Sequence, residues 1–277
     1  MNFDILFLSS FKEYLDHVVS EKLGSWTDVE IPVFETQDSR LPNYKILSSG
    51  DRQWVYDSGI TTNIVKSSNL SGGWEYSKID YTNSRIILPP GSVTTSDPMT
   101  VTGAAKRYNS YLSSSSDQTL LENTGFNRSP EMLSPDTSQK PYNYYAPCYF
   151  IKLSSTENDG FEVGSKDKVE YNIKVTYFTN SEFERICLAG VFRDLRNKPS
   201  FLIDKTPLDE FNDLKVTGWS YIQKMDEMLS IGQNKFYITD VRCTNLSGEG
   251  LLNKFPNSYI GIANFKVFVV KSMRQYS

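Results

Sequence analysis

One histidine and a scattered set of carboxylates are the side chains of this sequence that could carry acid–base chemistry. His17 is the single histidine of the 277-residue chain, so a Ser-His-Asp triad or a histidine metal site would have to use it. It lies between Tyr14 and Val18 in a segment with helical spacing, and the sequence offers it no partner. We interpret His17 as a packing or surface residue and expect no histidine-dependent catalysis.

Paired carboxylates would support glycoside hydrolysis, which needs two acidic residues and no histidine. The chain has 33 Asp and Glu residues, so the sequence alone leaves this chemistry open. Asp80 is the most suggestive, because the nearby Trp74, Tyr76 and Tyr81 are of the type that stacks on sugars. A turn aspartate that bonds backbone amides explains Asp80 more simply. A histidine-free glycoside hydrolase is therefore the least favoured alternative.

Metal and cofactor sites have no support in the sequence. Cys148, Cys187 and Cys243 are far apart and form no CxxC pair, which argues against a zinc site or a disulfide framework. The Gly72-Gly73 pair lacks the spacing of a phosphate-binding loop. We expect no cofactor, no metal ion and no enzymatic activity.

Composition limits the classes of partner. The 29 basic and 33 acidic residues give a net charge of −4, and no basic run is present, so we expect only non-specific contact with DNA. No stretch approaches the ~18 apolar residues of a membrane span. The amino terminus lacks the basic leader of a signal peptide. We expect a protein that is made in the cytoplasm and contacts no membrane.

Residues 10–23 are predicted to form an amphipathic helix. Ser10 and Glu13 have the spacing of a capping box, and Gly24 supplies a left-handed stop. The apolar stripe needs a partner, which is either the β core or a neighbouring subunit. Its positions at helical spacing include Phe11, Tyr14 and Val18.

Strand patterns dominate the rest of the chain. The clearest lies at residues 168–177, where apolar and polar residues alternate as in an antiparallel strand with one buried face. Its apolar positions are Val169, Tyr171, Ile173, Val175 and Tyr177. Further strands are predicted at residues 29–34, 53–57, 61–65, 147–153, 236–243 and 259–270, with a hairpin at residues 79–88 around Asn83.

Two further segments complete the predicted architecture. A second helix is predicted at residues 182–196, because Ser181 and Glu184 repeat the capping-box spacing and Phe183 and Ile186 begin an apolar stripe. The polar residues 109–143 have no clear period and are interpreted as a long arm or insertion. We predict a mainly β (α+β) fold with an antiparallel β-sandwich or barrel-like core, in a single domain of residues 1–277.

Several segments together resemble a family of virion structural proteins of tailed bacteriophages. Residues 79–88 read Ile-Asp-Tyr-Thr-Asn-Ser-Arg-Ile-Ile-Leu, which is similar to the family's hairpin of Ile-Asp-Tyr, Asn-Gly, Arg and an apolar run. Ser84 stands where that pattern has Gly, and Ser is poorer at positive φ, so we expect a longer or different turn. The other segments are residues 53–57, 147–153, 193–198, 201–204 and 207–208.

The resemblance implies a structural subunit of the virion, in a neck ring of the head–tail connector or tail-terminator type that lets DNA pass. Its partners would be other copies of the chain, in a ring of about six or twelve, and neighbouring head, neck or tail proteins. We take as candidate assembly contacts Phe11, Tyr14, Val18, Trp54, Trp74, Tyr76, Tyr81 and Arg85.

Two other readings stay open at this point. The chain is then either another virion component, such as a tail, baseplate or capsid-decoration protein, or a carbohydrate- or receptor-binding β-module. The β-module would use Trp74, Tyr76 and Tyr81 as exposed stacking surfaces. Binding of a glycan that is lost on changing Trp74 to Ala would distinguish it from a ring subunit.

Overall fold

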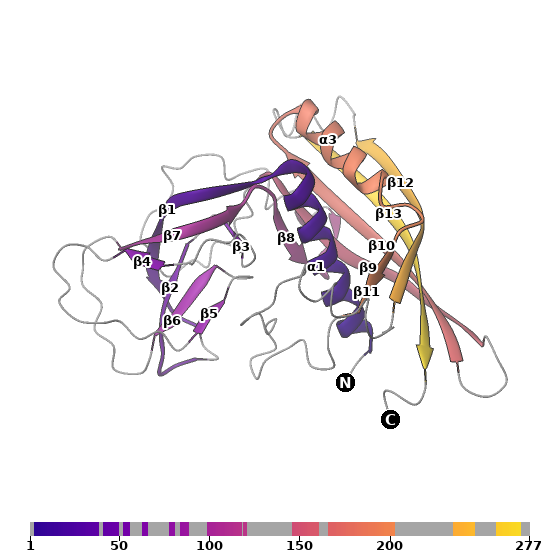
Figure 1. The fold of residues 1–277 in the computed structure, drawn as a ribbon, viewed down its shortest axis with the longest axis horizontal. Coiled ribbons are helices and arrows are strands. Elements are labelled where there is room, and N and C mark those ends of the chain that lie inside the picture. Colours follow the sequence, from indigo (N-terminus) through magenta and orange to yellow (C-terminus); the bar gives the residue numbers. More distant parts are fainter. Residues whose placement is uncertain are drawn as a thin grey trace.

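Two β-sheets and two helices form the described part of the chain in the computed structural model (Figure 1). The predicted mainly β class with additional helices is confirmed. Among the described residues, no helix is both long and apolar enough to cross a membrane. The structure describes residues 3–38, 41–49, 52–55, 63–65, 78–80, 84–88, 99–117, 119–120, 146–160, 166–202, 235–246 and 259–272.

Helix α1 (Phe3–Leu23) begins well before the predicted start at residue 10. Ser10 is not an N-cap, because its Oγ donates a hydrogen bond to the Leu6 carbonyl oxygen at 2.7 Å from inside the helix. The predicted capping box is therefore wrong, and apolar residues before Ser10 extend the buried stripe. The predicted end is confirmed: Gly24 has a φ of 83°, and its N–H donates to the Ser20 carbonyl at 2.9 Å.

The larger core belongs to a six-stranded sheet, called here the second sheet, with the order β11-β12-β13-β10-β9-β8. Its neighbouring strands are antiparallel except β8 and β9, which are parallel. Every strand predicted beyond residue 146 overlaps one of these strands. Their bounds are β8 (Asn109–Leu112), β9 (Cys148–Gly160), β10 (Lys166–Thr179), β11 (Pro199–Phe201), β12 (Lys235–Leu246) and β13 (Tyr259–Ser272).

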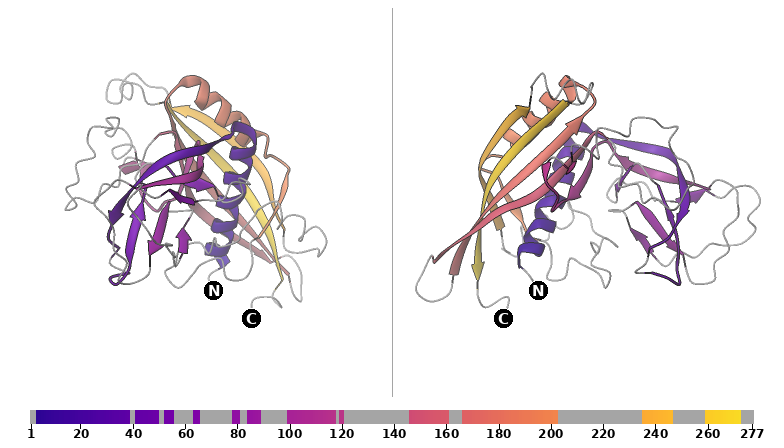
Figure 2. Two further views of the ribbon diagram at one scale, coloured as in Figure 1. Left: turned by 60° about the vertical axis from the view of Figure 1, so that its left-hand side comes forward. Right: turned by 180° about the vertical axis from the view of Figure 1, so that it is seen from behind.

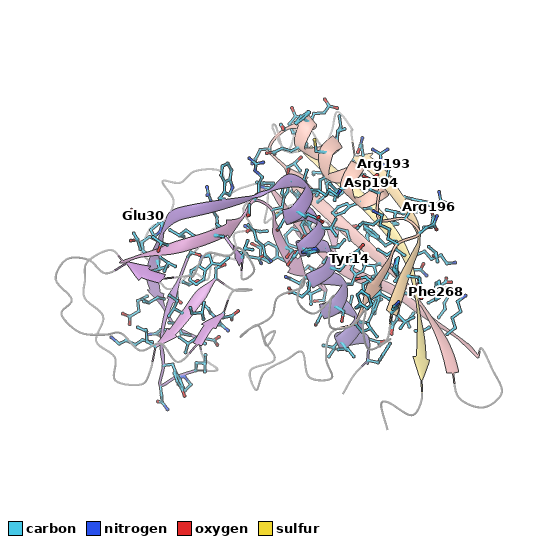
Figure 3. The ribbon with its side chains drawn as sticks, in the orientation of Figure 1. Tyr14, Glu30, Arg193, Asp194, Arg196 and Phe268 are labelled. Atoms are coloured by element: carbon cyan, nitrogen blue, oxygen red, sulfur yellow. The ribbon has the colours of Figure 1, made fainter. Side chains whose placement is uncertain are left out.

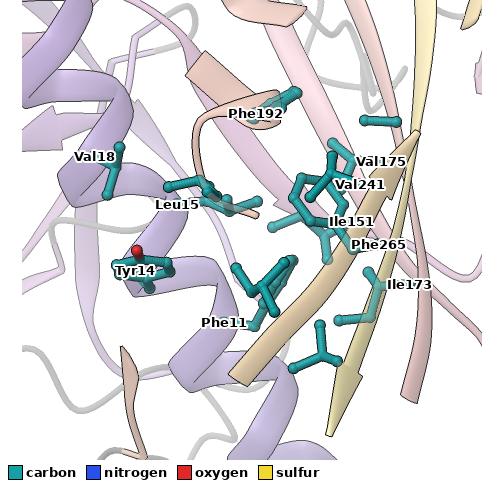
Figure 4. Packing of buried hydrophobic residues seen from close by; sticks show 14 of the residues in the cluster. Phe11, Tyr14, Leu15, Val18, Ile151, Ile173, Val175, Phe192, Val241 and Phe265 are labelled. Atoms are coloured by element: carbon teal, nitrogen blue, oxygen red, sulfur yellow. The ribbon is translucent and has the colours of Figure 1, made fainter. Parts of the chain in front are cut away.

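Helices α1 and α3 (Glu182–Arg193) cover one face of the second sheet. Figure 4 shows Phe11 and Leu15 of α1 pointing toward Phe265 and Ile151 of the sheet, with Phe192 of α3 above them. The five apolar positions predicted to share one face of β10 are all buried there. The partner of the α1 stripe is therefore the chain's own β core.

Helix α3 follows its predicted start and ends early. The Ser181 Oγ accepts a hydrogen bond from the Glu184 N–H at 3.2 Å, which confirms the predicted N-cap. The helix stops at Arg193, short of residue 196. The alternation in β13 places Phe268 on the sheet face opposite the helices, as Figure 3 shows.

The first sheet contains seven strands in the order β3-β7-β1-β2-β6-β5, with β4 paired to β7. Strand β1 pairs with β7 up to Val33 and with β2 from Phe34, so the sheet curls and its inner side chains share one core. Pro32 precedes the pairing with β2, so its missing N–H costs no bond there. The bounds are β1 (Ser25–Thr36), β2 (Lys45–Ser48), β3 (Trp54–Val55), β4 (Asn63–Val65), β5 (Lys78–Asp80), β6 (Arg85–Leu88) and β7 (Met99–Lys106).

The first sheet is inserted in the chain between α1 and β8. The chain enters it after Gly24 and leaves it after Lys106, and Ser25 and Lys106 are opposite each other in the β1–β7 pair. Figures 1 and 2 show the first sheet on one side of α1 and the second sheet on the other. No residue in the described part of the chain belongs to both cores. The single domain of residues 1–277 stays a prediction.

The predicted polar arm at residues 109–143 is wrong over its first part. Residues 109–112 form strand β8, and the side chains of Asn109 and Ser110 are buried. Leu120 is also buried, in a small cluster with Phe150 and Phe178 on the sheet face away from the helices. The strand was missed because its buried side chains are polar. Residues 121–143 lie outside the described residues.

Candidate functional site

Asp16 is a buried carboxylate where α1, β7 and β9 meet, and it accepts hydrogen bonds from three side chains. Its Oδ2 lies 2.7 Å from Nζ of Lys12, one helical turn earlier, and 2.5 Å from Nζ of Lys106 at the end of β7. Its Oδ1 accepts from Oη of Tyr149 on β9 at 2.5 Å. Asp16 is 6% exposed and Lys12 is 2% exposed. These four residues are called here the Asp16 cluster.

The charges within the cluster determine its proton affinities. Burial alone would raise the pKa of Asp16, but the ammonium groups of Lys106 and Lys12 hold that pKa well below its usual range. Burial lowers the pKa of Lys106. The pKa of Lys12 is raised, because the charges of Asp16 and Glu13 outweigh its burial. Burial and the Asp16 charge raise the pKa of Tyr149, which keeps the phenol a proton donor.

These properties suit the cluster for positioning rather than for proton transfer. A carboxylate with a strongly lowered pKa is a weak base. Both oxygens of Asp16 are occupied by donors from α1, β7 and β9. The arrangement can hold α1, β7 of the first sheet and β9 of the second sheet in a fixed orientation.

Gln53, just before β3, extends these polar contacts to the edge of the second sheet. Its side-chain Oε1 accepts from the Ser110 N–H at 2.9 Å, and its Nε2 donates to the Ser110 carbonyl at 2.7 Å. The amide thus pairs with Ser110 as a neighbouring strand would. The Gln53 N–H donates to Oδ1 of Asn109 at 2.9 Å, and its carbonyl accepts from the Lys106 N–H at 2.7 Å.

Sequence reasoning missed the Asp16 cluster and Gln53. One local signal existed, since Lys12 and Asp16 stand at i,i+4 and flank the apolar positions Phe11 and Leu15. Charges so close to a buried stripe indicate a paired, buried site. Lys106 gave no such signal, because the fold alone brings it to α1.

A second buried charge cluster holds the hairpin that carries the family resemblance. Nε of Arg85 donates to Oδ2 of Asp80 at 2.8 Å, and its Nη1 donates to Oδ2 of Asp38 at 2.8 Å. Asp80 and Arg85 are cross-strand partners in the β5–β6 pair, so four residues separate the strands. Ser84 has a φ of 53°. The positive φ that the prediction considered unfavourable for Ser is therefore adopted at this position, and the type of turn stays a prediction. Arg85, Asp80 and Asp38 are called here the Arg85 cluster.

The Arg85 cluster includes Asp80, the most suggestive glycosidase carboxylate of the sequence. Asp80 has 0% exposure and its carboxylate is paired with Arg85, so it does not face a substrate. The predicted bonds from Asp80 to backbone amides of the turn stay a prediction. Trp74, Tyr76 and Tyr81 lie outside the described residues.

The structure places five of the candidate assembly residues inside this chain. Phe11, Tyr14 and Val18 are buried against the second sheet. Trp54 is 2% exposed in the core of the first sheet. Arg85 is buried with its two carboxylates. The reason is common to all five, since each completes an internal core or ion pair of this chain.

The outer face of α3 carries the most exposed large apolar side chains of the described residues. Phe183 is 75% exposed and Ile186 is 51% exposed. Both residues were predicted to lie on the buried apolar stripe of this helix, and that prediction is wrong. The buried face is instead formed around Leu188 and Phe192, with Arg185 paired to Glu182 at 3.0 Å.

The remaining candidates for chemistry do not come together among the described residues. Cys148 is buried, and burial raises the pKa of its thiol, while Cys187 and Cys243 are partly buried and free of disulfides. His17 is partly buried on α1. In the part of the chain that the structure describes, no group of His, Cys, Asp and Glu side chains could hold a metal ion.

Neither a protein-family model nor a curated protein matches this chain.

Proposed function

We propose that this chain is a non-enzymatic structural subunit of a tailed-phage virion, and that copies of it form a ring in the neck that joins head and tail. In this role the chain makes and breaks no bond. It contacts other copies of itself and neighbouring head, neck or tail proteins, and DNA passes it without specific recognition.

The Arg85 cluster is the observation that carries this proposal. The Asp and Arg of the family-like hairpin are buried and paired with each other, so they define the shape of the turn and are not offered to a substrate. The Asp16 cluster has the same character, since its charged groups join elements of the chain. Charged residues that are used for internal rigidity suit a passive scaffold.

A ring also needs apolar surface between its copies. Phe183 and Ile186 on the outer face of α3 provide such surface in the described residues. Charged side chains lie near the end of the same helix, and Figure 3 shows Arg193, Asp194 and Arg196 there. A contact between copies that includes Phe183 and Ile186 is what the proposal predicts.

Mass measurement of the full chain in solution, combined with negative-stain imaging, tests the proposal. We expect a discrete ring of about six or twelve copies, formed by the chain alone or with candidate head or tail proteins. The double variant Phe183→Ala/Ile186→Ala should shift the protein toward the monomer, because its apolar contact is lost. Lys22→Ala, an exposed change on α1, is the matched control and should leave the ring intact.

Two outcomes would contradict the proposal. One is a chain that stays monomeric at every concentration and joins no particle with head or tail proteins. The other is turnover of a glycoside that depends on one particular carboxylate.

A further inference from the structure

We infer that the first sheet is a rigid unit that pivots on a polar joint, and that the bond between Lys106 and Asp16 is the lock that fixes its orientation. The joint is defined here as residues 23–25, residues 106–109 and Gln53. This inference does not rest on the proposed function.

The two connections to the first sheet lie side by side, which is the arrangement of a hinge. Ser25 and Lys106 are opposite each other in the β1–β7 pair, so both chain crossings occur at the same end of the sheet. Gly24, with its φ of 83°, lies in one crossing. The other crossing is anchored by Tyr108, which is buried in the core of the second sheet. Rotation about this end leaves both connections intact.

The two hydrophobic cores close independently of each other. The core of the first sheet is formed by side chains of β1, β2, β3, β5, β6 and β7, and the core of the second sheet by α1, α3 and their sheet. Among the described residues no side chain belongs to both cores, so a change of orientation need not open either of them. Units that meet through polar contacts are expected to move relative to each other unless those contacts hold them.

The contacts across the joint are polar and directional. Lys106 reaches Asp16 on α1, and Gln53 pairs with Asn109 and Ser110 of β8. At the surface, Nη1 of Arg107 donates to the Leu23 carbonyl at 2.9 Å, and its guanidinium lies 4.6 Å from the ring centroid of Trp26. Hydrogen bonds of this kind fit one orientation only. Among them, only the Lys106–Asp16 contact pairs opposite charges.

Lys106→Met is the sharpest test in the full-length chain. The variant removes the bond between Asp16 and the first sheet. Lys12 still pairs with Asp16, so the buried carboxylate keeps a cationic partner. Small-angle X-ray scattering should show a changed profile. Hydrogen exchange should become about tenfold faster at the amides of Gln53, residue 106 and Ser110. Amides of Ile86 in the first sheet and Val175 in the second should keep their protection.

Lys174→Met is the matched control. Lys174 on β10 pairs with Asp117, which follows β8, so this ion pair lies on the side of the second sheet. The change should therefore alter neither the scattering profile nor the hydrogen exchange at the joint. An unchanged profile for Lys106→Met would overturn the inference. So would loss of protection at Ile86 or Val175, because Lys106 would then hold the fold rather than its orientation.

Gln53→Leu repeats the test from the other side of the joint without any change of charge. It removes the side-chain bonds to Ser110 and should give the same change of profile on a smaller scale. If Lys106→Met fails to fold, Gln53→Leu decides the question by the same two criteria.

Discussion

The two buried charge clusters have the same arrangement with the signs of the charges reversed. In the Asp16 cluster one anion lies between two cations, and in the Arg85 cluster one cation lies between two anions. Asp80 is five positions from Arg85, whereas Asp16 is separated from Lys106 by 90 positions and from Tyr149 by 133. The same chemistry therefore shapes a turn in one place and joins distant parts of the chain in the other.

The surroundings of the two centres are similar. The side chains of Lys12 and Lys106 are 2% and 11% exposed, and those of Asp80 and Asp38 are 0% and 14% exposed. Each centre therefore has one fully buried partner and one slightly exposed partner, so a charge left unpaired in either cluster is costly.

The largest expected effect comes from removing the centre of the Asp16 cluster. Asp16→Ala leaves the ammonium groups of Lys12 and Lys106 close together, with Glu13 still 3.7 Å from Lys12. It should lower the free energy of unfolding by about 3–5 kcal/mol. Urea denaturation followed by circular dichroism measures this change. Asp240→Ala, which removes the partly buried partner of the exposed Arg242, is the control and should have no measurable effect.

Arg85→Met makes the comparison between the clusters direct. The variant leaves the carboxylates of Asp80 and Asp38 without Arg85, and the Asp38 side chain is partly hydrated. The free energy of unfolding should therefore fall by about 3 kcal/mol or less, the lower end of the range for a broken buried pair. A larger loss for Arg85→Met than for Asp16→Ala would show that the hairpin, and not the joint, is the more demanding site.

In an acid titration, protonation of Asp16 should lower the free energy of unfolding by a smaller amount. The folded pKa of Asp16 lies below its ordinary value of 3.8, so the unfolded chain takes up the proton first as the pH falls. The stabilisation from Asp16 is complete above that value and is lost as the pH falls through the folded pKa. Below about pH 4 the free energy of unfolding should drop with a slope of up to about 1.4 kcal/mol per pH unit from this group.

Asp16→Asn is the comparison in that titration, because it removes the titrating group and keeps its shape. Its stability curve should be flatter than that of the natural chain below about pH 4. Parallel curves would mean that Asp16 is not the group whose protonation weakens the fold.

Local patterns in the sequence predicted much of the fold. The alternation in β10 and the capping spacing at Ser181 gave the right element and the right buried face or start, because each depends on neighbours within a few positions. The same kind of pattern failed at Ser10, where apolar residues before it continue the helix. It also failed on α3, where apolar residues occur on two faces and only the packing against the sheet decides which is buried.

The sites were less accessible to sequence reasoning, for a physical reason. Arg85 was noticed because it lies in the hairpin of the resemblance, although its pairing with Asp80 in that hairpin was not predicted. Lys106 and Tyr149 could not be noticed, because chain topology alone brings them to Asp16. Phe11, Tyr14 and Val18 were correctly placed on an apolar stripe, but a stripe does not say whether its partner is the same chain or another.

The smallest expected effect concerns the one neutral donor of the Asp16 cluster. Tyr149→Phe removes a hydrogen bond to a charged group and keeps the ring against Phe192, whose centroid lies 5.9 Å away. The free energy of unfolding should fall by about 1.5 kcal/mol in the same urea measurement. Tyr171→Phe, which removes a bond to Asp4 near the start of α1, is the matched control and should cost less because that bond is only partly buried. If Tyr149→Phe costs as much as Asp16→Ala, the phenol and not the ammonium pair holds the cluster, and its charge balance is then not what sets it apart from the Arg85 cluster.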